Sequence, residues 1–186
     1  MSGARVLGSK MGENALARFG RDVLEQPGVR AVIVMMGIND IGWPGSTFAP
    51  SAPAGSVEAI TAGYRQLIER AHARGIRVVG ATLPPFENAL QGTPLEGHYT
   101  PAKDQTRQAL NAWIRSSGAF DAVADFDAAL RDPAHPARML PVYDSGDHLH
   151  PGDAGYEAMA KAIGMEMLFG NASDAGQRVV SQVAVK

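Results

Sequence analysis

Asp147 and His150 are the residues whose types and spacing point most directly to catalysis. They lie in the run Tyr143-Asp144-Ser145-Gly146-Asp147-His148-Leu149-His150-Pro151. A turn that ends at Pro151 would fold the Asp147 carboxylate onto the His150 ring, holding one ring nitrogen and leaving the other free as a base. This pattern predicts hydrolase chemistry, with His150 as general base and Asp147 as the acid that orients it.

The same run leaves other interpretations open. His148 competes with His150 for the role of base. A metal site at these two histidines with Asp147 or Asp144 is less favoured, because histidines two apart recur by chance and no third group of ligands stands out. We therefore expect no metal. A structural interpretation is a loop leading into a helix that Asp153 caps, and it is compatible with catalysis.

A second polar segment, Met36-Gly37-Ile38-Asn39-Asp40, comes directly after an apolar run. Open α/β sheets bind ligands at the carboxyl ends of their strands, so the Asn39 amide would reach the crevice there. In that place it would donate a hydrogen bond to a developing oxyanion, and Gly37 would permit the tight turn. The alternative is that Asn39 and Asp40 cap a following turn.

The elements that must position these residues alternate along the chain. Apolar, β-branched runs predict buried strands at residues 29–36, 76–83 and 119–126. Helical spacing predicts helices at residues 14–25, 57–75, 101–116 and 154–169, with a short one inside 127–140. Residues 41–56 and 86–99 are expected to be loops. This order predicts an α/β fold, a three-layer α/β/α sandwich with a parallel sheet.

Composition narrows the class of protein. The 186 residues suit one domain, expected at residues 1–170, and no apolar run approaches the ~20 residues of a membrane-spanning helix. A net charge of -2 with scattered Lys and Arg argues against nucleic acid as a partner. Zero Cys excludes thiolate catalysis and disulfides. The first residues show no signal peptide, and the compartment stays open. Residues 171–186 are expected to be a tail, either disordered or adding a strand through the β-prone run 179–185.

These motifs resemble those of the SGNH hydrolase family, also called GDSL esterases and lipases, over nearly the whole chain up to about residue 170. In that family a Gly-x-Asn-Asp segment supplies the oxyanion asparagine and a late Asp-x-x-His supplies acid and base, which fall here on Asn39, Asp147 and His150. The family's Ser-Gly block matches Ser2-Gly3, so Gly3 would donate its backbone N–H to the oxyanion. The resemblance implies a flavodoxin-like SGNH fold, hydrolysis of short acyl or aryl esters, and no cofactor.

The chain departs from the family at the nucleophile. The family's serine lies in a Gly-Asp-Ser segment upstream of the glycine block, and no Gly-Asp-Ser occurs here. We therefore expect an N-terminally truncated member that lacks the first strand, first helix and second strand. Ser2 is then the nearest candidate nucleophile, and Ser46, Ser51 and Ser56 are weaker ones. Without a serine, His150 would activate water directly.

Loss of those strands has a physical consequence. The family's sheet order, 2-1-3-4-5, leaves residues 31–36 as an exposed apolar edge, which is an aggregation hazard unless something pairs with it. We expect a homo-oligomer through this edge, or pairing with residues 179–185. The alternative function is a catalytically impaired remnant that serves as an oligomeric scaffold or an acyl-binding module. Trp43, Phe48, Phe86 and Tyr99 are candidate walls of an acyl or aryl pocket.

Overall fold

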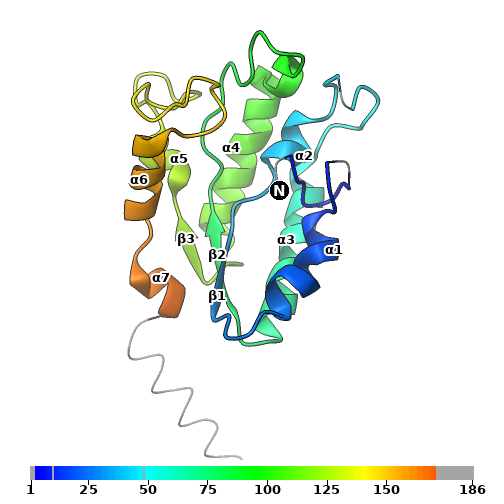
Figure 1. Ribbon diagram of the computed structural model, residues 1–186, viewed down its shortest axis with the longest axis vertical. Coiled ribbons are helices and arrows are strands. Elements are labelled where there is room, and N and C mark those ends of the chain that lie inside the picture. Colours follow the sequence, from blue (N-terminus) through cyan, green and yellow to red (C-terminus); the bar gives the residue numbers. More distant parts are fainter. Residues whose placement is uncertain (1–2, 10, 48, 171–186) are drawn as a thin grey trace, which may run out of the picture.

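The computed structural model describes residues 3–9, 11–47 and 49–170. Three strands, β1 (Ala31–Val34), β2 (Arg77–Ala81) and β3 (Ala122–Ala124), form a parallel sheet in the order β1-β2-β3. The helices are α1 (Ala15–Phe19), α2 (Ile38–Gly42), α3 (Val57–His72), α4 (Pro101–Ser116), α5 (Phe126–Leu130), α6 (Asp153–Lys161) and α7 (Met165–Phe169), with a π-helical turn η1 (Gly20–Leu24) and a 3₁₀ turn η2 (Glu96–His98). Figure 1 shows how they follow one another along the chain.

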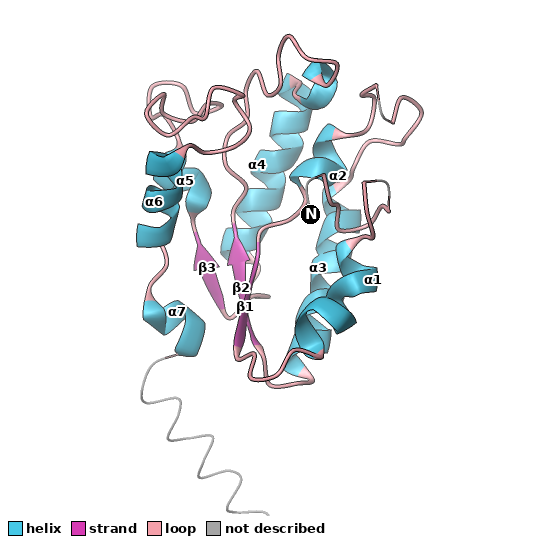
Figure 2. Cartoon of the chain, in the orientation of Figure 1, coloured by secondary structure: helices cyan, strands magenta, loops and turns pink. Residues whose placement is uncertain are grey.

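Helices cover both faces of the sheet, which confirms the predicted α/β sandwich (Figure 2). Side chains of β2 alternate between the faces: Val78 belongs to the core under α1, α3 and α4, whereas Val79 and Ala81 belong to the core under α5, α6 and α7. This alternation explains why residues 78–81 carry no charged or polar side chain, because a strand covered on both faces buries the side chains that point either way.

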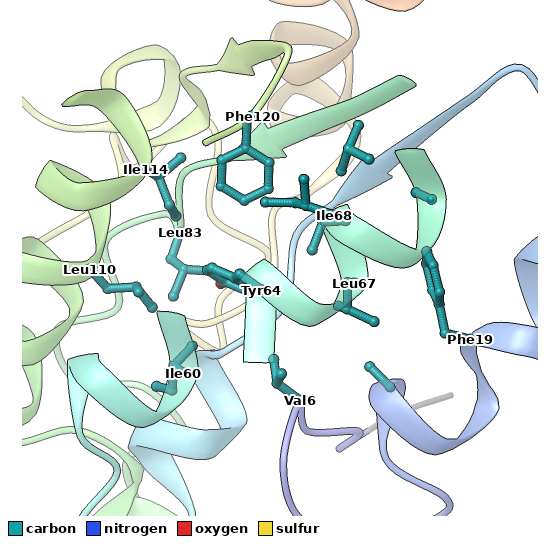
Figure 3. Close-up of a cluster of buried hydrophobic side chains, with 14 of the residues drawn as sticks. Val6, Phe19, Ile60, Tyr64, Leu67, Ile68, Leu83, Leu110, Ile114 and Phe120 are labelled. Atoms are coloured by element: carbon teal, nitrogen blue, oxygen red, sulfur yellow. The ribbon is translucent and has the colours of Figure 1, made fainter. Parts of the chain in front are cut away.

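Tyr64 in α3 connects the larger core to the end of β1. Its ring is fully buried with Leu67, Leu110 and Phe120 (Figure 3), and its hydroxyl donates a hydrogen bond to the Met36 carbonyl at 2.5 Å. The next residue, Gly37, has a φ of 110° and forms the N-cap of α2. A side chain there would be strained by the positive φ and would meet the Tyr64 hydroxyl at 3.1 Å. The start of α2, and with it Asn39, is therefore fixed by the core.

Two predicted elements are wrong in their extent. Residues 41–56 were expected to be a loop from their first residue, but Ile41 and Gly42 complete α2. The predicted helix 154–169 is divided into α6 and α7, since Gly164 has extended backbone and forms the N-cap of the second helix. Apolar spacing continues across this break, so it does not show in the periodicity.

The other differences concern element ends. The predicted helix 14–25 changes at Gly20 from α-helix to the π-helical turn η1. The predicted strands 29–36, 76–83 and 119–126 are shorter in the structure, as β1, β2 and β3. Within 127–140 the regular part is α5, followed by a bridge between Arg131 and Met139.

Strand β1 lies at an edge of the sheet, as expected, and within the described residues it pairs with β2 alone. Ile33 and Met35 are 37% and 41% exposed along this edge. Residues 171–186, for which a tail or an added strand was predicted, lie outside the described residues, and the division at residue 170 stays a prediction. Of the helices in the described ranges, none has the length and apolar character needed to cross a bilayer.

Candidate functional site

A pocket of about 390 Å³ lies where the carboxyl ends of β1 and β2 meet the N-terminal segment and the loop before α6. Three of the residues predicted from the sequence, Gly3, Asn39 and His150, line this one pocket. Apolar side chains form much of the remaining wall; they include Met35, Met36, Leu83, Leu90, Leu95 and Leu149. The structure thus brings together groups that are distant in the sequence.

The turn before α6 joins Asp147 to His150. Oδ2 of Asp147 lies 2.6 Å from Nδ1 of His150, and Oδ1 accepts the backbone N–H groups of Leu149 and His150, each at 2.8 Å. Partial burial alone would raise the pKa of Asp147, but the hydrogen bonds from His150 and Leu149 outweigh it and lower the pKa to about 2. The carboxylate is therefore ionised at neutral pH and able to hold an imidazole.

Asn39 and Trp43 hold the N-terminal segment against α2. Nδ2 of Asn39 donates to the Ala4 carbonyl at 3.0 Å, and Nε1 of Trp43 donates to the Gly3 carbonyl at 3.1 Å. Because an amide nitrogen carries two hydrogens, Asn39 retains one donor beyond this bond. Gly3 and Asn39 are thereby kept beside each other at the pocket wall.

Asp40, the neighbour of Asn39, has a structural role. Its carboxylate is buried and accepts the backbone N–H groups of Val6 at 2.8 Å and Leu7 at 3.0 Å. Burial raises the pKa of Asp40, and these hydrogen bonds oppose that shift. The carboxylate therefore anchors the N-terminal segment instead of capping the turn after Asn39.

The competing histidine, His148, belongs to a different pocket. Its Nδ1 lies 2.5 Å from Oδ2 of Asp144, and both residues line a pocket of about 280 Å³ with Glu87 and Arg138. His148 is absent from the wall that Gly3, Asn39 and His150 share. Within the described ranges, neither this pocket nor any other place brings together three His, Asp or Glu side chains that could hold a metal ion.

None of the described candidate nucleophiles lines the pocket. Ser2 lies outside the described residues. Ser56 accepts the Ala59 N–H at 3.1 Å as the N-cap of α3, Ser46 is buried away from the pocket, and Ser51 is exposed. Among the described residues that line the pocket, none is a serine or threonine.

Sequence reasoning missed two polar residues of the pocket, His98 and Tyr156. Both lie outside the motifs, and His98 comes from a loop without periodicity, so no pattern identified it. Of the proposed aromatic walls, Trp43 lines the pocket. Phe86 and Tyr99 pack against each other, with ring centroids 5.2 Å apart, and Phe48 lies outside the described residues.

Comparison with known proteins identifies the family and the fold. A model of the GDSL-like lipase/acylhydrolase family matches residues 1–158. No curated protein matches the sequence. A GDSL-like lipase from Bacteroides thetaiotaomicron has a TM-score of 0.64 and 21% identity, covering 82% of this chain and 68% of that one. An α/β hydrolase from the metagenome of Lake Arreo has a TM-score of 0.61 and 18% identity, covering 92% of this chain and 71% of that one. An acetylxylan esterase from Geobacillus stearothermophilus has a TM-score of 0.55 and 23% identity, covering 80% of this chain and 63% of that one. At these identities the superpositions show a shared fold.

Proposed function

Since the chain belongs to the GDSL-like lipase/acylhydrolase family, we propose that it is an esterase, a carboxylic ester hydrolase that acts on short acyl or aryl esters. The resemblance to SGNH hydrolases expected from the sequence is thereby confirmed at the level of the family. The observation that carries the proposal is that Gly3, Asn39 and His150 line one pocket while Asp147 holds His150 at 2.6 Å.

His150 acts as the general base in this proposal. With Nδ1 engaged by Asp147, the neutral ring carries its proton on Nδ1 and presents an unprotonated Nε2. Nε2 takes the proton of the attacking hydroxyl as its oxygen adds to the ester carbonyl carbon. The same nitrogen then returns the proton to the leaving alcohol as the tetrahedral intermediate collapses.

The oxyanion of that intermediate is stabilised by Asn39 and Gly3. Asn39 offers the amide hydrogen that the Ala4 carbonyl does not occupy, and Gly3 offers its backbone N–H. Donors already held in place stabilise the transition state without reorganisation, and one such donor is worth about 10²- to 10³-fold in kcat.

The attacking group is a serine or a water molecule. Ser2 directly precedes the pocket residue Gly3 in the sequence and is the candidate serine. Attack by its hydroxyl forms an acyl-enzyme that water hydrolyses in a second round through His150. If no serine attacks, His150 activates water directly, and the oxyanion donors supply a residual acceleration of about 10³-fold or more over solution.

The pocket supports a small ester as substrate. Its volume of about 390 Å³ is near the lower end of ligand sites, and methionine and leucine side chains form much of its wall. The acetylxylan esterase with the same fold acts on an acetyl ester, a short acyl group of the proposed class.

A second candidate function is favoured by the lack of a serine among the described pocket residues. On this alternative the chain is a catalytically impaired member of the family that binds acyl groups or serves as an oligomeric scaffold. Both functions use the same pocket, and they differ in turnover.

Hydrolysis of para-nitrophenyl acetate and butyrate separates the two. We expect His150→Ala to lower kcat/KM by about 10³-fold, whereas the matched control His148→Ala leaves it unchanged, because His148 lies in the other pocket. Equal rates for the wild type and His150→Ala would reject the esterase and leave the catalytically impaired family member as the function. Labelling with a fluorophosphonate followed by mass spectrometry identifies a serine nucleophile, and an unlabelled but active protein points to water.

A further inference from the structure

His98 is a buried imidazole without hydrogen-bond partners. It lies in η2, its side chain is 1% exposed, and within the described part of the chain neither Nδ1 nor Nε2 makes a hydrogen bond. Buried polar atoms are nearly always paired, because leaving one unpaired costs the full desolvation of that group. His98 also lines the pocket that holds Asn39 and His150.

The ring is held rigidly in this position. Trp43 and Phe86 meet it edge to face, with centroids 5.9 Å and 6.3 Å away. The Nε2 edge packs on Gly42, where an added Cβ would lie 2.3 Å from Nε2, so only glycine allows the approach. Lys103 fixes the surrounding backbone by donating to the carbonyls of Gly42 at 2.7 Å and Gly97 at 2.6 Å.

The surroundings keep this imidazole neutral. Burial, and then the charges of Lys103 and His150, lower the pKa of His98 to about 4. A neutral imidazole has one nitrogen that donates and one that accepts. A hydroxyl group also donates and accepts, so it can pair with a ring nitrogen in either tautomer of the imidazole. A methyl group of similar size would leave the nitrogen unpaired.

We propose that His98 is a specificity residue that hydrogen-bonds a hydroxyl group of the ester substrate and so selects hydroxylated esters over apolar esters of equal size. The inference rests on the proposed esterase function and extends it to a substrate class. The hydroxyl belongs to the acyl chain or to the alcohol, and the two arms of the test below distinguish these sources.

The test compares esters that differ by a hydroxyl in place of a methyl. One pair, para-nitrophenyl β-hydroxybutyrate and β-methylbutyrate, places the hydroxyl in the acyl chain; the other, hydroxyethyl acetate and propyl acetate, places it in the alcohol. In the pair whose hydroxyl reaches His98, we expect the wild type to hydrolyse the hydroxylated ester with a kcat/KM higher by about 10-fold or more. His98→Phe abolishes that preference, whereas His98→Asn restores part of it. An unchanged preference in His98→Phe overturns the proposal.

A binding measurement on the wild type keeps this test independent of turnover and of the folding of variants. With ¹⁵N-labelled histidine, the ring nitrogens of His98 are followed by NMR during titration with the non-hydrolysable amides N-hydroxyethylacetamide and N-propylacetamide, and with β-hydroxybutyramide and β-methylbutyramide. We expect a hydroxylated amide to shift a His98 nitrogen and its methyl analogue to leave it in place. A His98 shift without ester turnover would reject the esterase and retain the binding site. No selective shift with either pair rejects the role of His98.

Discussion

The Asp147 carboxylate contacts His150 at two points, accepting its backbone N–H at 2.8 Å through Oδ1 and lying 2.6 Å from its ring Nδ1 through Oδ2. A carboxylate that holds both the backbone and the ring of one residue fixes the position and the tautomer of the imidazole together. The orientation of the proposed base is therefore set within a single turn of chain.

Asp147→Asn tests this orientation. The asparagine amide can donate to Nδ1, which favours the tautomer with its proton on Nε2 and removes the base. We expect kcat for para-nitrophenyl butyrate to fall by about 10²- to 10⁴-fold with little change in the fold. The control is Asp144→Asn, which alters the corresponding pair with His148 in the other pocket. Similar losses in the two variants would contradict the assignment of His150.

Asn39→Ala tests the oxyanion donor. We expect kcat to fall by about 10²- to 10³-fold while KM changes little, because the donor acts mainly on the transition state. The variant also loses the hydrogen bond to Ala4, so the free energy of unfolding should fall by about 1 kcal/mol. Loss of stability with kcat retained would give Asn39 a purely structural role.

The acid stability of the protein should depend on His98. Its pKa is about 4 in the folded state and 6.5 ordinarily, so the unfolded chain takes up this proton first as the pH falls. The stabilisation is complete above pH 6.5 and is lost toward pH 4, by about 3 kcal/mol in total. Urea titrations at several pH values should show a shallower decline in His98→Phe. Parallel declines in the two proteins would refute the buried neutral state.

The substitution Arg107→Met tests a buried cluster of charged side chains beside the loop that follows β2. Its guanidinium is 1% exposed and bonds Asp104 and Asp127, each at 2.7 Å, and the Leu83 carbonyl at 2.9 Å. Arg107→Met leaves buried carboxylates short of a partner, so the free energy of unfolding should fall by about 3–5 kcal/mol in urea titrations. As a matched control, Arg21→Met removes an exposed ion-paired arginine, and its unfolding midpoint should stay that of the wild type. A small loss in Arg107→Met would mean that the cluster relaxes around the change.

Local patterns predicted the parts of the molecule that depend on local physics. Residues 78–81 are apolar because both faces of β2 are covered, and the Asp147 carboxylate bonds a histidine only three residues along the chain. Two other features escaped prediction. The burial of His98 requires Gly42 and Trp43 to approach from another segment, and the break before α7 is hidden by continuing apolar spacing.

The free edge of β1 predicts self-association. The backbone groups on this side of the strand lack a partner strand within the described ranges, and Ile33 is exposed there. Beside the strand, a groove of about 140 Å³ is lined mainly by apolar residues, among them Phe19 and Val23, and also by Arg18 and Asp22. A second copy can pair with the strand about a two-fold axis, because an antiparallel pair of identical strands is self-complementary. We therefore propose a homodimer through this edge.

Sedimentation of the wild type and Ile33→Lys measures this association. A lysine at the edge opposes pairing, so we expect a dimer for the wild type and a monomer for the variant. Val142→Lys, at a residue 67% exposed in the loop before α6, is the control and should remain a dimer. A dimer that persists in Ile33→Lys would locate the interface elsewhere. If the wild type is a monomer and becomes a dimer when residues 171–186 are deleted, then that segment covers the edge of β1 in place of a second copy.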